Sequence, residues 1–223
     1  MKYAKIILLV FLITSAFLMS GYAQKQVPDA TLNYNISIES SNGDKSNLAK
    51  SLDGAALTIY ISPSESRSDM KSSLGTESNI YSTKTGKGFI LKEYSGQKLM
   101  ITLTKENWLQ KNQYFQNMKF NIDNSETMIG EFKCRKATAT LADGKTFVVY
   151  FTPDVTAANK EYNNAFKNLP GIPVQYEQES GKLKFKYTLT RISYDNIPDS
   201  KFDIPKFGFR VMTYEENQQL KKG

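Results

Sequence analysis

The chain contains no histidine and only one cysteine, and both shortages limit the chemistry open to it. Ser-His-Asp and Cys-His nucleophile systems need an imidazole base, and most catalytic zinc sites use histidine ligands. Carboxylates are plentiful, but the pairs Glu177/Glu179 and Glu215/Glu216 lie where solvated surface charge is expected. We therefore predict a protein that is not an enzyme and that uses no metal and no cofactor.

The single cysteine, Cys134, cannot form an internal disulfide, so the fold must be stabilised by burial of apolar surface. Cys134 lies two residues after Phe132 in a segment that reads as a strand. Unpaired cysteine is among the most buried residue types. We expect Cys134 to be a small buried hydrophobe; a reactive thiol is the alternative.

Long hydrophobic runs are absent except at the start of the chain. Lys2 and Lys5 precede an apolar run over Ile6–Met19, and the small residues of Ser20–Ala23 follow. This pattern predicts a secretory signal peptide cleaved after Ala23. The site lacks the cysteine of a lipoprotein anchor, and the remainder shows no membrane-spanning run. We expect a periplasmic protein, with secretion to the exterior as the alternative.

Residues 24–213 are predicted to form one domain, and residues 214–223 a polar, frayed C-terminal tail. Loss of residues 1–23, which carry two lysines, would lower the formal net charge from +7 to +5. The lysines are interspersed with acidic residues rather than clustered, which is typical of a soluble surface and argues against a nucleic-acid partner.

Strand signals dominate the domain. Apolar and polar residues alternate in five segments, as expected for strands with one buried face, and the Asp143-Gly144 pair predicts a tight hairpin between Ala137–Leu141 and Phe147–Phe151. Short connections favour neighbouring antiparallel strands. The alternating segments are Leu32–Ile38, Leu57–Ile61, Leu99–Leu103, Met118–Ile122 and Leu183–Leu189.

Three short helices are expected. Val155–Leu169 has three- and four-residue apolar spacing, an N-cap at Asp154 or Thr156 and a stop at Pro170-Gly171. Thr104–Phe115 could form another, with Trp108 and Leu109 facing the sheet, and Ser46–Leu52 is a weaker candidate. The sequence thus predicts a mainly β protein of the α+β class.

Three stretches resemble a family of exported bacterial proteins of unknown function, the GLPGLI-like group. The segment Ile129–Ala137, with the following hairpin, looks like the family's central hairpin. Leu169–Val174 is similar to the Leu-Pro-Gly stretch that names the group, and Ile197–Pro205 resembles the way such chains end.

This resemblance implies a fold similar to the LolA/LolB lipoprotein carriers: a curved, incompletely closed antiparallel half-barrel that wraps a few short helices. In those carriers the concave apolar face shelters acyl chains. The resemblance also implies that a basic residue near Arg67 lies inside the half-barrel, where it ties helices to the sheet or meets a ligand. An exposed Arg67 beside the Pro63-Ser64 turn is the alternative.

The residues expected to line a ligand cavity are Ile59, Ile61, Arg67, Leu99, Ile101, Leu103 and Trp108. Plain core packing is the competing interpretation for the aliphatic residues and for Trp108. The leading hypothesis is a non-catalytic periplasmic binding module for a lipid, a lipidated protein or another hydrophobic ligand. The alternative is a structural or interaction protein of the cell envelope that has a filled core, a protein partner and no ligand.

Overall fold

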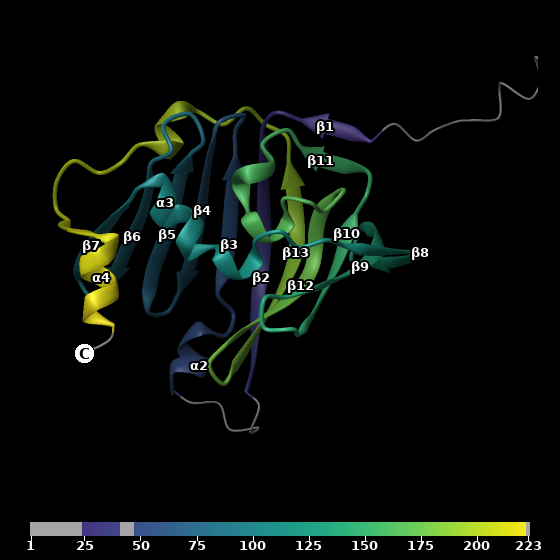
Figure 1. The fold of residues 1–223 in the computed structure, drawn as a ribbon, viewed down its shortest axis with the longest axis horizontal. Coiled ribbons are helices and arrows are strands. Elements are labelled where there is room, and N and C mark those ends of the chain that lie inside the picture. The colour runs from purple at the N-terminus through teal and green to yellow at the C-terminus, as the bar shows by residue number, and fades with distance from the viewer. Residues whose placement is uncertain (1–23, 41–46, 222–223) are drawn as a thin grey trace, which may run out of the picture.

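The computed structural model describes residues 24–40 and 47–221, so the predicted signal peptide lies outside the described residues. The described chain is built mostly from strands (Figure 1). The strands are β1 (Lys25–Val27), β2 (Ala30–Ser40), β3 (Ala56–Ile61), β4 (Glu65–Ser72), β5 (Gly75–Ser82), β6 (Gly88–Tyr94), β7 (Gln97–Leu103), β8 (Asn121–Ile129), β9 (Phe132–Thr140), β10 (Thr146–Thr152), β11 (Val155–Ala157), β12 (Ile172–Ser180), β13 (Leu183–Ser193) and β14 (Arg210–Thr213). The α-helices are α2 (Asn47–Leu52), α3 (Lys105–Lys111) and α4 (Tyr214–Leu220), and the 3-10 turns are η1 (Gln113–Phe115), η2 (Lys160–Tyr162), η3 (Asn164–Phe166) and η4 (Asp199–Phe202).

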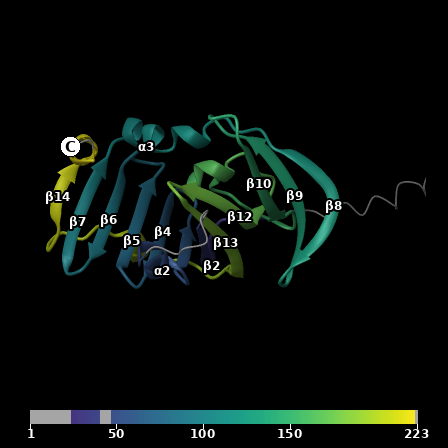
Figure 2. The ribbon, with the colours of Figure 1, turned by 90° about the horizontal axis from the view of Figure 1, so that it is seen from below.

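Twelve strands form one sheet in the order β14-β7-β6-β5-β4-β3-β2-β13-β12-β10-β9-β8. All neighbours are antiparallel except β14 and β7, which run parallel. The end strands β14 and β8 do not pair with each other, and Figure 2 shows the sheet curving between them. The expected fold class, a curved and incompletely closed antiparallel sheet with few short helices, is confirmed.

Strand β2 shows how the alternating pattern sets the two faces of the sheet. Leu32, Tyr34, Ile36 and Ile38 are buried, whereas Asn35 and Ser37 between them are exposed. Successive side chains of a strand point to opposite faces, so these four residues define one face. We call it the inner face; it is concave in Figure 2 and carries the main hydrophobic cluster.

The hairpin expected at Asp143-Gly144 is present between β9 and β10. Gly144 adopts a φ of 83°, which favours glycine, and its N–H donates to the Leu141 carbonyl over 2.9 Å. The Asp143 carboxylate accepts from the Lys145 N–H over 3.1 Å. Turn chemistry that is local in sequence therefore located this connection correctly.

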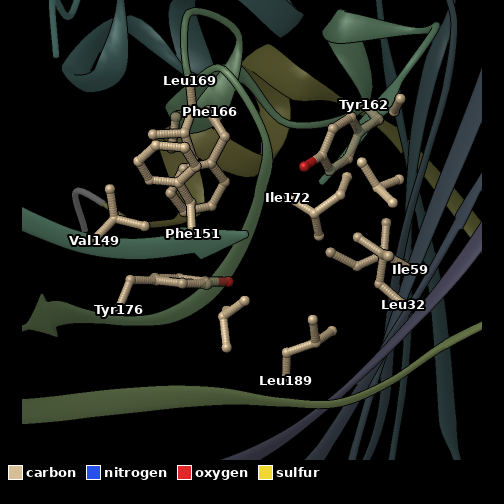
Figure 3. Close-up of a cluster of buried hydrophobic side chains, with 14 of the residues drawn as sticks. Leu32, Ile59, Val149, Phe151, Tyr162, Phe166, Leu169, Ile172, Tyr176 and Leu189 are labelled. Carbon is tan, nitrogen blue, oxygen red and sulfur yellow. The ribbon is translucent and has the colours of Figure 1, made fainter. Parts of the chain in front are cut away.

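The segment 155–169 fills the inner face but is not the predicted helix. Val155–Ala157 forms β11, which pairs in parallel with β1, and the 3-10 turns η2 and η3 follow. The side chains of Asn159 and Asn163 accept from the N–H groups two residues on, and such local bonds compete with a continuous helix. The apolar residues of the segment are nevertheless buried in the main cluster, and Figure 3 shows Phe166 and Leu169 against Phe151.

The Leu-Pro-Gly stretch joins this segment to β12 at the centre of the core. Leu169 and Ile172 are fully buried, and the Tyr34 hydroxyl donates to the Pro173 carbonyl over 2.7 Å. A Cβ atom on Gly171 would lie 2.1 Å from the carbonyl oxygen of Thr152. Glycine is therefore required here for close approach between two backbones rather than for an unusual φ.

The C-terminal part departs from the expected frayed tail. Residues 214–220 form α4, which starts with a reciprocal capping box between Thr213 and Glu216 and buries Tyr214. Capping and burial together stabilise a short helix that its polar composition alone would not predict.

The predicted Met118–Ile122 strand is correct only at its end, because β8 begins at Asn121. Met118 is buried, and its carbonyl accepts from the Asn168 side chain over 2.9 Å instead of joining a strand ladder. That bond comes from a residue far along the chain, which the local pattern does not reveal.

Cys134 is buried in β9, as predicted, and its Sγ donates to the Phe132 carbonyl over 3.4 Å. Burial raises the pKa of its thiol to about 11, so the reactive thiolate is depleted at neutral pH. We expect Ellman's reagent to leave the folded protein unlabelled and to label the protein in denaturant. Rapid stoichiometric labelling of the folded protein would show that the thiol is accessible.

Candidate functional site on the inner face

The predicted cavity residues separate into two hydrophobic clusters. Ile59 and Ile61 are buried in the main cluster with Leu32 and Phe166. Ile101, Leu103 and Trp108 are buried in a second cluster, against which the half-buried Leu99 packs. Core packing therefore accounts for the buried residues, and among the predicted aliphatic residues Leu99 keeps substantial exposure on the inner face.

Trp108 is positioned by helix α3, which a capping box at Thr104 starts directly after β7. Its indole stacks on the ring of Tyr81 with centroids 4.4 Å apart and planes 4° apart. A Cβ on Gly88 would lie 3.0 Å from the indole, so glycine leaves room for the flat contact. Trp108 faces the sheet as expected, whereas Leu109 is 42% exposed and does not.

Arg67 lies on the opposite, outer face, so its predicted place inside the half-barrel is wrong. It pairs in register with Tyr60 and Ile80, whereas its neighbours Ser66 and Ser68 share the inner face with Ile59 and Ile61. Arg67 Nε donates to Asp69 Oδ1 over 2.7 Å, and Nη1 donates to the Lys201 carbonyl in η4 over 3.1 Å. Arg67 thus ties the C-terminal segment to the sheet. Figure 2 shows this segment running along the outer side of the sheet.

Arg67→Ala is expected to lower the free energy of unfolding by about 1.5–3 kcal/mol, because it removes charge-assisted hydrogen bonds and leaves the mostly buried Asp69 carboxylate without its partner. Thermal unfolding followed by circular dichroism measures the loss. Arg191→Ala, at an exposed position of β13, is the matched control and should change stability little. Equal losses in the two variants would contradict a tying role for Arg67.

A pocket of about 760 Å³ opens where β10 and β12 separate. Their ladder ends at Val149 and Tyr176, so Thr146–Val148 and Glu177–Ser180 pair only with β9 and β13. The Lys145–Glu179 ion pair, 2.7 Å long, bridges the split.

Aromatic side chains form the apolar wall of this β10–β12 pocket. The ring of Phe147 lies 6.4 Å from those of both Phe115 and Tyr176, measured between centroids. Tyr176 in turn stacks on Tyr187 of β13 at 4.7 Å, which connects the pocket to the rest of the inner face. The sequence did not predict this pocket, because a strand pattern does not show where a ladder ends.

A second part of the inner face is a row of half-buried residues across β3–β7, which we call the inner strip. Each member is opposite the next in the strand register, and so they cross five strands in line. Figure 1 shows α3 over the upper part of the sheet, α4 beside β7 and α2 below β2. The inner strip comprises Leu57, Met70, Glu77, Lys92 and Leu99.

The inner strip carries charge among apolar neighbours. Lys92 Nζ lies 3.3 Å from Glu77 Oε2, and the Tyr94 hydroxyl donates to the same carboxylate oxygen over 3.3 Å. Desolvation and the Glu77 charge raise the pKa of Tyr94 to about 12. Burial and then the charge of Glu77 also raise the pKa of Tyr187, again to about 12.

Helix α3 adds a further cation. Lys111 Nζ lies 5.4 Å from the centroid of the Trp108 ring. Although much of the Lys111 side chain is exposed, surrounding protein partly desolvates its amino group and lowers its pKa; Glu77 opposes this shift, whereas Lys221 and Lys92 reinforce it.

The rest of the described chain was searched for further pockets, metal ligands and membrane-spanning helices. A second pocket, of about 700 Å³, lies between the β5–β6 turn and the starts of α3 and α4, and it includes Lys84, Lys87 and Lys105. Within residues 24–40 and 47–221, no three acidic or cysteine side chains gather in a way that could hold a metal ion. The same residues include no helix long and apolar enough to cross a membrane.

No family model and no curated protein matches the chain. Several solved structures have a similar fold. PNGF-II in a P21 crystal form matches 87% of this chain with a TM-score of 0.49 and 9% identity, and the chain spans 33% of that protein. An uncharacterized conserved protein from Thermus thermophilus matches 83% of this chain and 90% of its own, with a TM-score of 0.49 and 9% identity.

MucB matches 80% of this chain and 58% of its own, with a TM-score of 0.39 and 10% identity. At sequence identities this low, the matches to these structures concern the fold alone. The resemblance to the GLPGLI-like group therefore remains one carried by short stretches.

Proposed function

We propose that the chain is a non-catalytic binding module, exported to the cell envelope, that holds a lipid, the acyl chain of a lipidated protein or another amphiphile on its inner face. The observation that carries this proposal is the β10–β12 pocket, whose volume of about 760 Å³ and aromatic wall suit a largely apolar ligand. Pockets for small ligands typically enclose ~300–1,000 Å³ and are mostly apolar.

The position of the pocket also supports an amphiphilic ligand. Its apolar wall lies beside the charged pairs Lys145–Glu179 and Lys184–Glu177, so one region can take an alkyl chain while another stays hydrated. Each buried methylene contributes ~0.8 kcal/mol, so a chain needs no specific polar contact to bind. The stacked rings of Tyr176 and Tyr187 extend the apolar surface toward the inner strip.

The alternative, an envelope interaction protein with a filled core, is favoured by one observation. Most of the aliphatic residues expected to line a cavity are buried in the two clusters instead. On that view the pocket would hold only water, and a protein partner would be the functional contact.

Native mass spectrometry of the gently purified protein from residue 24 onward separates the two functions, combined with thermal unfolding in the presence of added amphiphiles. The binding module predicts a bound apolar mass or a rise in melting temperature that depends on ligand concentration. Phe147→Ala, which removes part of the pocket wall, should reduce that rise. A bare mass together with an unchanged melting temperature for every amphiphile would reject the binding function.

A further inference from the structure

The β10–β12 pocket is lined by side chains from both faces of the sheet, because it opens where two neighbouring strands separate. Tyr176 and Gln178 of β12 point to the inner face. Glu177 and Glu179 point to the outer face, since successive side chains of a strand alternate. With the buried Phe147 beside Tyr176, the pocket has an aromatic inner end and a charged outer end.

The charged groups of the outer end are paired with one another. Lys145 Nζ lies 2.7 Å from Glu179 Oε2, and Lys184 Nζ lies 2.6 Å from Glu177 Oε2. Asp143, in the adjoining β9–β10 turn, lies 4.0 Å from the same Lys145 Nζ. The lining residues thus carry two positive and two negative charges, each beside an opposite one. An ionic head group would have to compete with a pair that is already formed.

Uncharged polar groups of this pocket, in contrast, lack partners among the described residues. The β10–β12 ladder does not reach Thr146–Val148 or Glu177–Ser180, so the facing strand edges carry backbone N–H and C=O groups with no ladder partner. The half-buried Gln178 side chain lines the pocket and has no hydrogen-bond partner in the described chain. Its amide both donates and accepts, so it can bind a hydroxyl without any charge.

We propose that the β10–β12 pocket selects an uncharged amphiphile, such as a long-chain alcohol or a monoacylglycerol. Its hydroxyl head lies at Gln178 and its alkyl chain along Phe147 and Tyr176. This inference rests on the proposed function and gives its ligand a class of head group. The Lys145–Glu179 pair determines the specificity, because removal of either partner would leave a charge that attracts an ionic head.

The test compares dodecanol, dodecanoate and dodecylamine, which share one alkyl chain and differ in head charge. Isothermal titration calorimetry of the protein from residue 24 onward should show tighter binding of dodecanol than of either ionic amphiphile. Because the alkyl chain is constant, the differences report on the head.

Charge variants assign that selection to the ion pair. Glu179→Gln should strengthen dodecanoate binding, since Lys145 then keeps only Asp143, and Lys145→Gln should strengthen dodecylamine binding. Both partners are more than half exposed, so each gain should be about three- to fivefold, with dodecanol binding unchanged. Glu93→Gln is the matched control, because it breaks the Lys98–Glu93 pair, also 2.7 Å long, outside the pocket.

A second pair of variants tests the hydroxyl contact. Gln178→Met keeps the length of the side chain but removes its amide, and it should weaken dodecanol binding about fivefold. Gln175→Met is the control, since the Gln175 amide also lines the pocket but already donates to Thr188 over 3.2 Å. It should leave dodecanol binding nearly unchanged. Circular dichroism verifies that each variant is folded.

The outcomes separate this inference from the proposed function. Dodecanoate or dodecylamine binding as tightly as dodecanol, or equal responses in Glu179→Gln and Glu93→Gln, would overturn the selection of an uncharged head while the binding module stands. A Gln178→Met variant that binds dodecanol at full strength would overturn it as well. If none of the three amphiphiles binds, the inference and the proposed function both fail.

Discussion

Replacing Gly171 with alanine is expected to lower the free energy of unfolding by more than about 3 kcal/mol, among the largest effects of any single methyl group in this chain. The added Cβ would lie 2.1 Å from the Thr152 carbonyl oxygen and 2.6 Å from Cδ2 of Phe151. A side chain could rotate away, but the Thr152 backbone belongs to β10 and pairs with Ile172. Relief therefore requires β12 to move away from β10, which would disturb the buried bond from Tyr34 to the Pro173 carbonyl.

Gly144→Ala is the matched control for this prediction. Gly144 has a φ of 83°, and a Cβ added to it would have no neighbouring atom within 4 Å, so alanine there meets backbone strain of ~1–2 kcal/mol and no clash. Chemical denaturation of the two variants gives both free energies. Comparable losses of unfolding free energy in the two variants would mean that the close approach of the Gly171 and Thr152 backbones is not the reason why glycine is needed at position 171.

Trp108→Ala is expected to cost about 3–5 kcal/mol, the typical loss for a large aromatic side chain removed from a core. The indole fills the space between α3 and the sheet, stacked on Tyr81 and lying over Gly88. At ~2–4 °C per kcal/mol for a domain of this size, the melting temperature should fall by roughly 6–20 °C.

Leu109→Ala is the control for Trp108, because it changes the next residue of the same helix at an exposed position. It should cost less than about 1 kcal/mol, and Trp108→Phe should fall between the two. A Trp108→Ala variant as stable as Leu109→Ala would show that the helix does not depend on the indole, contrary to a structural role.

The strands could be predicted because their signal is local. In β2 apolar and polar residues alternate along almost the whole strand, and in β13 they alternate as far as Thr190, so burial of one face fixes both the element and its orientation. Arg67 shows where this reasoning ends. It lies between Ser66 and Ser68, and a single apolar residue of β4, Met70, indicates which face is inner, so the alternating signal is weak in this strand. A shift of one residue moves a side chain to the other face.

The remaining errors involve contacts between distant segments. Val155–Ala157 pairs with Lys25–Val27, which lies at the other end of a long stretch of chain, and this pairing replaces the start of the expected helix. The inner strip has the same origin, since its five members come from five strands and are aligned only by register. The predicted site contained Leu99 from this strip but not Glu77, Lys92 or Lys111.

The β10–β12 pocket permits the most direct test of the proposed binding function. Calorimetric titration of the protein from residue 24 onward with dodecanol and dodecanoate is predicted to show saturable binding of at least one of them. Phe147→Ala should weaken that binding, and Leu109→Ala, at an exposed position outside the pocket, should leave it unchanged. Saturable binding that Phe147→Ala leaves unchanged would place the ligand elsewhere, and the absence of binding would contradict the proposed function.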